Sequence, residues 1–271
     1  MTKKIVFIGA GNMTRSIISG LVASQYPVDA IHATNPSTAK LDALKADFGV
    51  QVSSDNLAAA NDADVIILSV KPQLMQQVCE ALKPINLDSK LFITIAAGIP
   101  GARYNDYFGQ PINLIRAMPN TPMQIGVGMS GLYAPDSATA EDKALCEMIM
   151  ASGGDTVWVE QESDLNQVIA LAGSSPAYFF LFMEAMMAAA NDLGMSEDKA
   201  RRLVQQAALG AAQMVKQNPN LTPAELKQNV MSKGGTTARA VETFEAGDLR
   251  GLVKSAMVNC INRAEEMAKT F

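Results

Sequence analysis

The chain has 271 residues and a mass of 28.8 kDa, a length that allows one large domain or two of ordinary size. Apolar residues make up 48% of it and charged residues 18%, which excludes a highly charged disordered chain and predicts a globular protein. The formal net charge of −5, without any basic block longer than a pair of residues, excludes nucleic acid as the main partner.

The first 160 or so residues alternate short apolar runs with segments of helix length. Strands of a buried parallel sheet are apolar on both faces, and several runs of four or five residues have this pattern. They are residues 5–8, 30–33, 65–68, 91–95 and 113–116, with a weaker candidate at 156–159. The alternation predicts an α/β fold with a doubly wound parallel sheet.

Helix signals dominate the rest of the chain. Pro176 suits the first turn of a helix that Gly194 ends, and Ser196 can cap the next helix. Residues 222–225 have the pattern of a capping box with Pro at the first helical position. A short helix and a final helix follow the loop at residues 232–237.

The change of pattern predicts two domains, an α/β domain at residues 1–160 and an all-α domain at 161–271. The longest apolar stretch, residues 177–190, is shorter than the roughly 20 residues that span a bilayer, so we expect a buried helix there. The N-terminus lacks the features of a secretory signal, and three widely separated cysteines fit a reducing compartment. These features predict a cytoplasmic protein.

A glycine motif directly follows the first predicted strand. Gly9-Ala-Gly11-Asn-Met-Thr14 is the pattern G-x-G-x-x-G with Thr in the third position, and a helix-length segment comes next. Gly9 permits a tight turn, Gly11 lets the backbone approach a pyrophosphate, and the helix N-terminus offers free N–H groups to the anion. Thr14 is expected to cost some closeness of helix to strand. The motif predicts a Rossmann-type dinucleotide site; the alternative is a glycine turn in a domain without a ligand.

The segment after the second predicted strand indicates which dinucleotide is bound. NAD sites carry an Asp or Glu there, which binds the ribose 2′-OH. Here the residues are Thr34-Asn35-Pro36-Ser37-Thr38, followed closely by Lys40, with no carboxylate. Amide, hydroxyl and ammonium donors favour a 2′-phosphate, so NADPH is the predicted cofactor, with NADH as a second donor.

Few other side chains suggest chemistry. The single histidine, His32, lies within a predicted strand and is expected to be a packed or edge residue, so no histidine-based triad is expected. No residue spacing suggests a metal site. The remaining candidates are polar loops at residues 69–72, 96–98, 118–122, 173–176 and 232–237.

The first three of these loops follow predicted strands, so they should lie at the carboxyl edge of the sheet, where doubly wound folds bind ligands. In the last loop, Ser232-Lys-Gly-Gly-Thr-Thr237, two glycines and two threonines open a helix. That arrangement predicts a neutral site for a small carboxylate. The alternative for each loop is a simple turn or helix cap.

Together these motifs resemble the pyrroline-5-carboxylate reductase family, which catalyses the last step of proline biosynthesis. The resemblance rests on G-A-G-N-M, S-V-K-P-Q, A-A-G-I, R-A-M-P-N-T-P, G-S-S-P-A-Y and S-K-G-G-T-T, beginning at residues 9, 69, 96, 116, 173 and 232. Thr14, Ser175 and Lys233 depart from the residues usual in the family. The resemblance implies hydride transfer from NAD(P)H to the C=N bond of 1-pyrroline-5-carboxylate, giving L-proline.

The resemblance also implies residue roles and an assembly. Expected dinucleotide contacts are Gly9, Ala10, Gly11, Asn12, Met13, Asn35, Ser37, Asn56, Val70, Lys71, Pro72, Ala97 and Asn120. Expected substrate contacts are Glu162, Ser232, Gly234, Gly235, Thr236 and Thr237, with Thr237 as the catalytic hydroxyl. The all-α domain is expected to pair with that of a second subunit in a homodimer or a ring of dimers, with no membrane or nucleic-acid partner.

Two alternatives stay open on the residues alone. The first is another imine reductase or a β-hydroxyacid dehydrogenase of similar architecture, for which Lys199, Lys216 and Lys227 are candidate lysines in the helical domain. The second is a non-catalytic NADP-binding regulator.

Overall fold

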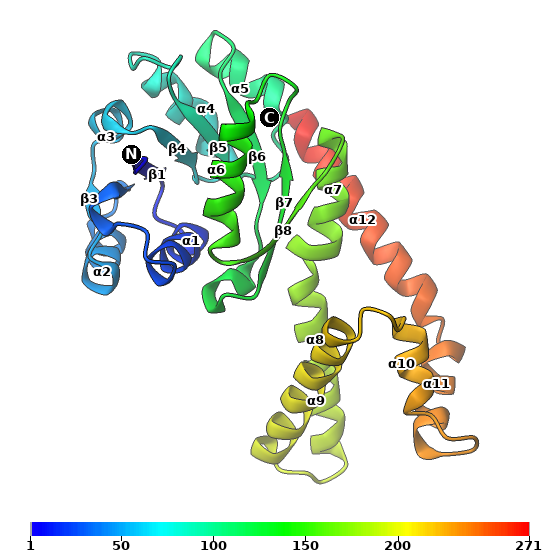
Figure 1. Cartoon of the computed structure of the whole chain (residues 1–271). Helices are drawn as coiled ribbons and strands as arrows, with labels where there is room; N and C mark the ends of the chain where they lie inside the picture. The colour runs from blue at the N-terminus through cyan, green and yellow to red at the C-terminus, as the bar shows by residue number, and fades with distance from the viewer. Residues whose placement is uncertain (1, 271) are drawn as a thin grey trace. The chain divides into compact units, whose positions relative to one another are not determined.

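The N-terminal part of this computed structural model, which describes residues 2–270, contains one eight-stranded sheet (Figure 1). The strand order is β3-β2-β1-β4-β5-β6-β7-β8, and neighbouring strands are parallel except for the β6–β7 pair. The strands are β1 (Ile5–Ile8), β2 (Ile31–Thr34), β3 (Gln51–Ser53), β4 (Val65–Leu68), β5 (Leu91–Thr94), β6 (Leu114–Met118), β7 (Gly128–Tyr133) and β8 (Gly154–Trp158). The predicted doubly wound sheet is confirmed.

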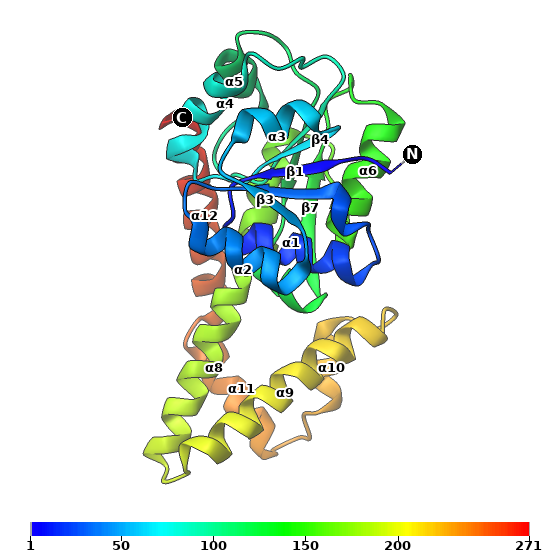
Figure 2. The same cartoon turned by 90° about the vertical axis from the view of Figure 1, so that its left-hand side faces the viewer.

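The helices of this part cover both faces of the sheet. One face carries α1 (Asn12–Ala23), α2 (Thr38–Phe48) and α6 (Ala140–Ala151), and the other carries α3 (Asn56–Asp62), α4 (Pro72–Leu82) and α5 (Gly101–Phe108). Figure 2 shows α3 on one side of β1, β3 and β4, and α1 and α2 on the other. Every residue of β1, β4 and β5 is buried, which is why these strands are apolar on both faces.

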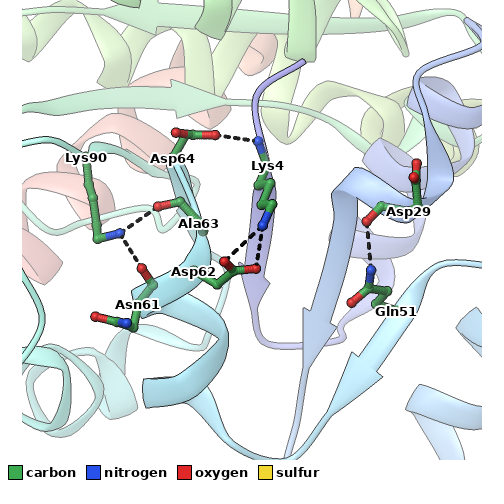
Figure 3. A network of polar contacts seen from close by, with 8 residues as sticks. All are labelled: Lys4, Asp29, Gln51, Asn61, Asp62, Ala63, Asp64 and Lys90. Carbon is green, nitrogen blue, oxygen red and sulfur yellow. Dashed lines mark hydrogen bonds and ion pairs between the residues drawn. The ribbon is translucent and has the colours of Figure 1, made fainter. Parts of the chain in front are cut away.

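Ion pairs and hydrogen bonds fasten the amino edge of the sheet (Figure 3). The Lys4 ammonium lies 2.9 Å from both carboxylate oxygens of Asp62, and the Lys4 backbone N–H donates to Asp64 Oδ2. The Lys90 ammonium is largely buried and donates to the carbonyl oxygens of Asn61 and Ala63, at 2.9 and 2.6 Å. A cation at these carbonyls suits the C-terminal end of α3. These contacts therefore connect the segments before β1 and β5 to the end of α3.

Two strands were not predicted, β3 and β7. The β3 segment is three residues long with an exposed Gln51, so it lacks an apolar run. In β7, Gly128 and Gly131 fit because a Cβ would lie 2.3 Å from Met123 Cγ and 2.5 Å from Val168 Cγ1, respectively. The predicted strands at 30–33, 113–116 and 156–159 are displaced by one or two residues from those observed.

Short helical turns lie between elements of this part and between β8 and the later helices. They are η1 (Val28–Ala30), η2 (Thr121–Ile125), η3 (Glu162–Asp164), α7 (Leu165–Val168) and the π-helix η4 (Ile169–Gly173). Residues of α7 pack beside Met118 in a third, small apolar cluster.

The chain separates into two compact units, one running up to Pro176 and resuming at Asn259, the other covering Ala177–Val258. The sequence placed its domain boundary at residue 160, so the compact units divide the chain later than composition does. The remaining helices are α8 (Ser175–Asp192), α9 (Glu197–Gln217), α10 (Pro223–Asn229), α11 (Thr236–Ala246) and α12 (Leu249–Thr270).

The predicted helix signals have mixed outcomes. The capping box is confirmed, because Thr222 Oγ1 accepts from the Glu225 N–H while the Glu225 carboxylate accepts from the Thr222 N–H. These bonds lower the pKa of the exposed Glu225 carboxyl. Ser196 occupies the N-cap of α9, but its side chain makes no capping hydrogen bond.

Helix α8 is not buried within the described chain. It contains no buried residue, and the side chains of Phe179, Phe180 and Leu181 are each more than 60% exposed. The resemblance implies that this helix packs in the core of a dimer, and within the single described chain the helices of its unit leave it exposed. By length and composition alone, residues 162–192 could also cross a membrane.

Candidate functional site

The polar loops predicted at the carboxyl edge of the sheet do share that edge. Strand β1 pairs with β2 on one side and with β4 on the other, which makes the ends of β1 and β4 the switch point of the sheet. The loop after β1 begins at Gly9, and the loop after β4 contains Ser69, Val70 and Lys71. A crevice beside these loops is where doubly wound folds bind their ligands.

The loop between β1 and α1 is suited to a bound pyrophosphate. Gly9 has φ +111°, and a Cβ there would lie 2.8 Å from the Ser69 carbonyl oxygen, so another residue would be strained and would clash. Gly11 is the N-cap of α1, and a Cβ built on it meets nothing within 4 Å. Helix α1 has no side-chain cap and no acidic residue in its first turn. Its N-terminal N–H groups can therefore receive an anion.

Thr14 connects the two loops of the switch point. Its side chain is fully buried, and Oγ1 lies 2.8 Å from the Gly9 carbonyl oxygen and 2.9 Å from Ser69 Oγ. Ser69 Oγ in turn lies 3.0 Å from the carbonyl oxygens of Ile8 and Gly9. The sequence indicated only a loss of packing at Thr14; the hydroxyl network was missed.

The loop after β2 presents donors and no carboxylate. Asn35 Oδ1 accepts from the Ala10 N–H at 3.3 Å, which connects this loop to the glycine motif. Ser37 is the exposed N-cap of α2, and its side chain makes no capping bond. Lys40 is exposed in the first turn of that helix. Helix α2 therefore has no side-chain hydrogen bond at its N-cap.

The other predicted dinucleotide contacts are distributed along the same edge of the sheet. Asn12 and Met13 begin α1, and Asn56 begins α3 directly after β3. Lys71 is the N-cap of α4, with Pro72 as the first helical residue, and Val70 packs close to Gly9. Ala97 is half-buried in the loop after β5. Their roles toward a cofactor stay predictions.

The side-chain amide nitrogen and oxygen of Asn120 both have hydrogen-bond partners within the protein. The residue is buried, its Nδ2 donates to the carbonyl oxygen of Ala172 at 3.0 Å, and its Oδ1 accepts from the Met129 N–H at 2.8 Å. Ala172 belongs to the π-helix η4, so Asn120 ties that helix to β7. The predicted contact of Asn120 with a dinucleotide stays untested beside this structural role.

Glu162 forms a compact cluster with Arg116 in β6 and with the first residue of α5. Its Oε1 accepts from Arg116 Nη1 at 2.7 Å and from the Gly101 N–H at 2.6 Å. Arg116 lies within β6, and its side chain is only 8% exposed. Glu162 is implied as a site residue by the family resemblance, whereas Arg116 stands only at the start of the R-A-M-P-N-T-P motif. A charged residue inside an otherwise apolar strand was the signal for a buried partner.

The loop at Ser232–Thr237 belongs to the second compact unit. Gly235 is the N-cap of α11, which starts at Thr236, and a Cβ on Gly235 would lie 2.3 Å from Ser232 Oγ. Thr236 and Thr237 are exposed. Their hydroxyls and that of Ser232 have no hydrogen-bond partner among residues 2–270. The alternative that Thr237 is an N-cap is therefore wrong, since the cap lies two residues earlier.

His32 and the cysteines are structural in this chain. His32 lies in β2, half-buried, with Nε2 3.1 Å from Ser53 Oγ, and burial lowers its pKa although Asp62 opposes the shift. Burial raises the pKa of the Cys79 thiol to about 12 and also raises that of Cys146. Among residues 2–270 no three His, Cys, Asp or Glu side chains are grouped to hold a metal ion.

Two protein-family models match the chain. One, described as pyrroline-5-carboxylate reductase dimerisation, matches residues 162–267. The other, described as NADP oxidoreductase, coenzyme F420-dependent, matches residues 4–98. Each match falls on one of the two regions that the sequence separated.

Individual relatives match over the whole chain. The pyrroline-5-carboxylate reductase of Vibrio alginolyticus is 55% identical over 269 residues, or 99% of each chain. The solved structure of a pyrroline-5-carboxylate reductase from Coxiella burnetii has a TM-score of 0.92 at 40% identity and 99% coverage of each chain. The Plasmodium falciparum pyrroline carboxylate reductase, solved with NADP bound, has a TM-score of 0.88 at 27% identity, covering 98% of each.

Proposed function

This chain belongs to the pyrroline-5-carboxylate reductase family, and we propose that it reduces the C=N bond of 1-pyrroline-5-carboxylate to give L-proline. The observation that carries the proposal is the 55% identity to a reductase of the same length, together with the loops at one edge of the sheet. The same identity disfavours a β-hydroxyacid dehydrogenase, another imine reductase and a non-catalytic regulator.

The residues at the switch point fit a nicotinamide dinucleotide. The open space at Gly11 and the uncapped N-terminus of α1 suit the pyrophosphate, and the Ala97 loop is at the carboxyl end of a strand two places from β1. When bound, the cofactor supplies the hydride for the imine carbon. The protein then has to hold the two reactants in line and exclude competing geometries.

NADPH is the proposed cofactor in preference to NADH. Ser37, Lys40 and the N-terminus of α2 offer donors to a 2′-phosphate, and no carboxylate stands among residues 34–40 to repel it. Loss of one charge-assisted contact, about 1.5–3 kcal/mol, corresponds to roughly tenfold to over a hundredfold in efficiency. Ser37→Asp should reverse the preference. Equal kcat/KM for NADPH and NADH in the wild type contradicts this assignment.

The substrate carboxylate is proposed to bind at the loop from Ser232 to Thr237. Gly234 and Gly235 bring backbone N–H groups to the start of α11, whose first turn contains no acidic residue. The exposed hydroxyls of Ser232, Thr236 and Thr237 add donors without a net charge. A hydroxyl or a water molecule suffices to protonate an imine nitrogen, so the site needs no histidine.

The proposed assembly is a homodimer or a ring of dimers in the cytoplasm. Residues 162–267 match a dimerisation model, and the exposed apolar side chains of α8 require cover. The apolar helices of a second copy can cover these side chains, so a membrane is not needed to remove them from water.

Turnover of NADPH with 1-pyrroline-5-carboxylate tests the function directly. We expect loss of NADPH absorbance with this substrate, and no gain of NADPH absorbance when NADP is incubated with a panel of 3-hydroxy acids. Oxidation of a 3-hydroxy acid in place of imine reduction assigns the chain to a different reaction.

Thr237→Ala tests the catalytic assignment. We expect catalytic efficiency to fall by about a hundredfold, because the hydroxyl acts on the imine or its carboxylate. NADPH affinity and the melting temperature should change little. The matched control is Thr243→Ala in the same helix, whose hydroxyl bonds only to the Arg239 carbonyl oxygen. Equal kinetics in the two variants moves the catalytic role away from Thr237.

A further inference from the structure

The contacts of Glu162 suggest a role different from touching the substrate. Its Oε1 already accepts two hydrogen bonds, at 2.6 Å from the Gly101 N–H and at 2.7 Å from Arg116 Nη1. A Cβ on Gly101 would lie 3.3 Å from the same oxygen, so glycine at this position leaves room for the carboxylate. The carboxylate therefore joins the N-terminus of α5 to the middle of β6.

Gly101, the first residue of α5, directly follows the loop that carries Ala97. That loop, residues 95–100, leaves β5 and is held at several points. The Ala96 N–H donates to Thr94 Oγ1, which is paired with the buried Tyr104 hydroxyl. A Cβ on Gly98 would lie 2.7 Å from Met267 Cβ, so the end of α12 packs directly on the loop.

The segment that follows Glu162 contacts the same loop. Ala97 packs against a small cluster formed by Met118, Leu165 and Val168. Leu165 and Val168 lie three and six residues after Glu162, in α7. The hydrogen bond from the Gly101 N–H and the apolar contact at Ala97 therefore hold this loop at two points, one directly after it and one within it.

Burial of the Arg116 guanidinium costs desolvation free energy. The side chain is buried, and among the described residues its Nε has no hydrogen-bond partner. An ion pair with the half-buried Glu162 carboxylate often does no more than offset the cost of removing the guanidinium from water. Such a group calls for an explanation other than stability. Holding the Glu162 carboxylate in one position is such an explanation.

We infer that Glu162 and Arg116 are positioning residues, which fix residues 96–101 so that Ala97 meets the nicotinamide in a reactive geometry. This inference rests on the proposed reductase function. Arg116 neutralises and orients Glu162, Glu162 fixes the Gly101 N–H, and the loop between β5 and α5 keeps one conformation. Neither residue touches the substrate in this arrangement.

The variants are Glu162→Gln, Arg116→Met and the double variant, with Glu160→Gln as the matched control. Glu160 is exposed and two residues from Glu162, so it reports any effect of losing a nearby charge. Gly101→Ala is the fourth variant, because it displaces the carboxylate without changing any charge. It also keeps the inference testable should Arg116→Met fail to fold.

The readouts are kcat, KM for 1-pyrroline-5-carboxylate, the Kd of NADPH and the kinetic isotope effect with 4-deuterated NADPH. We expect Glu162→Gln, Arg116→Met and Gly101→Ala to lower kcat by about tenfold or more and to raise the isotope effect, since displaced reactants slow the hydride step. KM for the imine should stay within about twofold, as for a residue that binds no substrate. The double variant should be no slower than the slower single variant.

Three outcomes contradict the inference or its premise, and they can be told apart. A large rise in KM in Glu162→Gln, with normal kinetics in Arg116→Met and Gly101→Ala, makes Glu162 a substrate contact and overturns the positioning role. Variants that all match Glu160→Gln also overturn it. Absence of imine reduction in both the wild type and Glu160→Gln refutes the proposed function, and the positioning role with it.

Discussion

The two compact units of the chain bury their apolar side chains to very different extents. In the unit that runs up to Pro176, every residue of β1, β4 and β5 is buried between two layers of helices. In residues 177–258, only Ala200, Val204 and Ala238 are buried in the described chain. One contact between aromatic rings, Phe182 with Phe244 at 5.8 Å, lies in this second unit. The first unit thus has a core of its own, whereas the second needs a partner surface.

A charge in α8 should produce the largest change. We expect Phe180→Asp to convert the protein from a dimer or larger assembly into monomers and to lower the melting temperature. A buried Phe contributes about 1.5–3 kcal/mol, a symmetric interface loses it twice, and an unpaired carboxylate costs more. Light scattering and thermal melting measure both effects.

The control for Phe180→Asp lies in the first unit. Met148 in α6 is 41% exposed, and Met148→Asp should leave the assembly and the melting temperature nearly unchanged. If both variants keep the wild-type size, α8 is not the subunit interface and the contrast between the units has another cause.

Within the first unit, Lys90→Met should have the next largest effect. It leaves the carbonyl oxygens of Asn61 and Ala63 without the buried ammonium, at a cost of about 1–3 kcal/mol. Lys83→Met, at an exposed position, is the comparison. Urea unfolding of the two variants should differ in midpoint while light scattering shows the same assembly. Equal midpoints exclude a stabilising role for the Lys90 contacts.

At the switch point, Thr14→Val should weaken NADPH binding by about fivefold, which corresponds to one hydrogen bond of about 1 kcal/mol. Thr14 Oγ1 and Ser69 Oγ both lie within hydrogen-bond distance of the Gly9 carbonyl oxygen, and loss of the Thr14 hydroxyl leaves that carbonyl with Ser69 alone, which should orient the loop less well. Thr14→Ser keeps the hydroxyl and should retain the affinity. Fluorescence titration without substrate measures the Kd, and equal values in both variants remove the hydroxyl from the binding site.

The smallest expected effect is at His32. Burial lowers its pKa below the usual 6.5 of a histidine, so the unfolded chain binds a proton more readily than the folded protein does. The free energy of unfolding should therefore fall as the pH drops below about 6.5 and on toward the folded pKa. His32→Gln should reduce this dependence in urea unfolding measured at several pH values. An unchanged pH dependence assigns the effect to carboxylates instead.

The parts of the fold that the sequence predicts are those in which burial leaves a pattern in the residues. The runs at 5–8 and 65–68 match β1 and β4 without error, because a central strand must be apolar on both faces. Strand β7 lacks this pattern, since it packs by means of Gly128 and Gly131 and owes its place to Met123 and Val168. The contact between Gly131 and Val168 joins segments far apart in the sequence, so it leaves no local signal.

In the candidate site, too, local motifs could be predicted from the sequence and long-range contacts could not. The motif at Gly9 and Gly11 was predictable because the turn itself requires glycine. The link from Thr14 to Ser69 and the pair formed by Arg116 and Glu162 were not, because each joins residues 46 or more positions apart. A resemblance named Glu162, but only the folded chain brings Arg116 and Gly101 to it.

Packing of Met267 on Gly98 has a consequence for the order of events during synthesis. The loop that carries Ala97 is complete early, yet the side chain that covers it follows about 170 residues later. At roughly 5–20 residues per second, the ribosome needs on the order of 10–30 seconds to make that stretch. The nascent sheet can form during this interval, but its Gly98 loop stays without the α12 contact until Met267 has left the ribosome. The first unit thus reaches its native packing only after the segment that carries Met267 has been made.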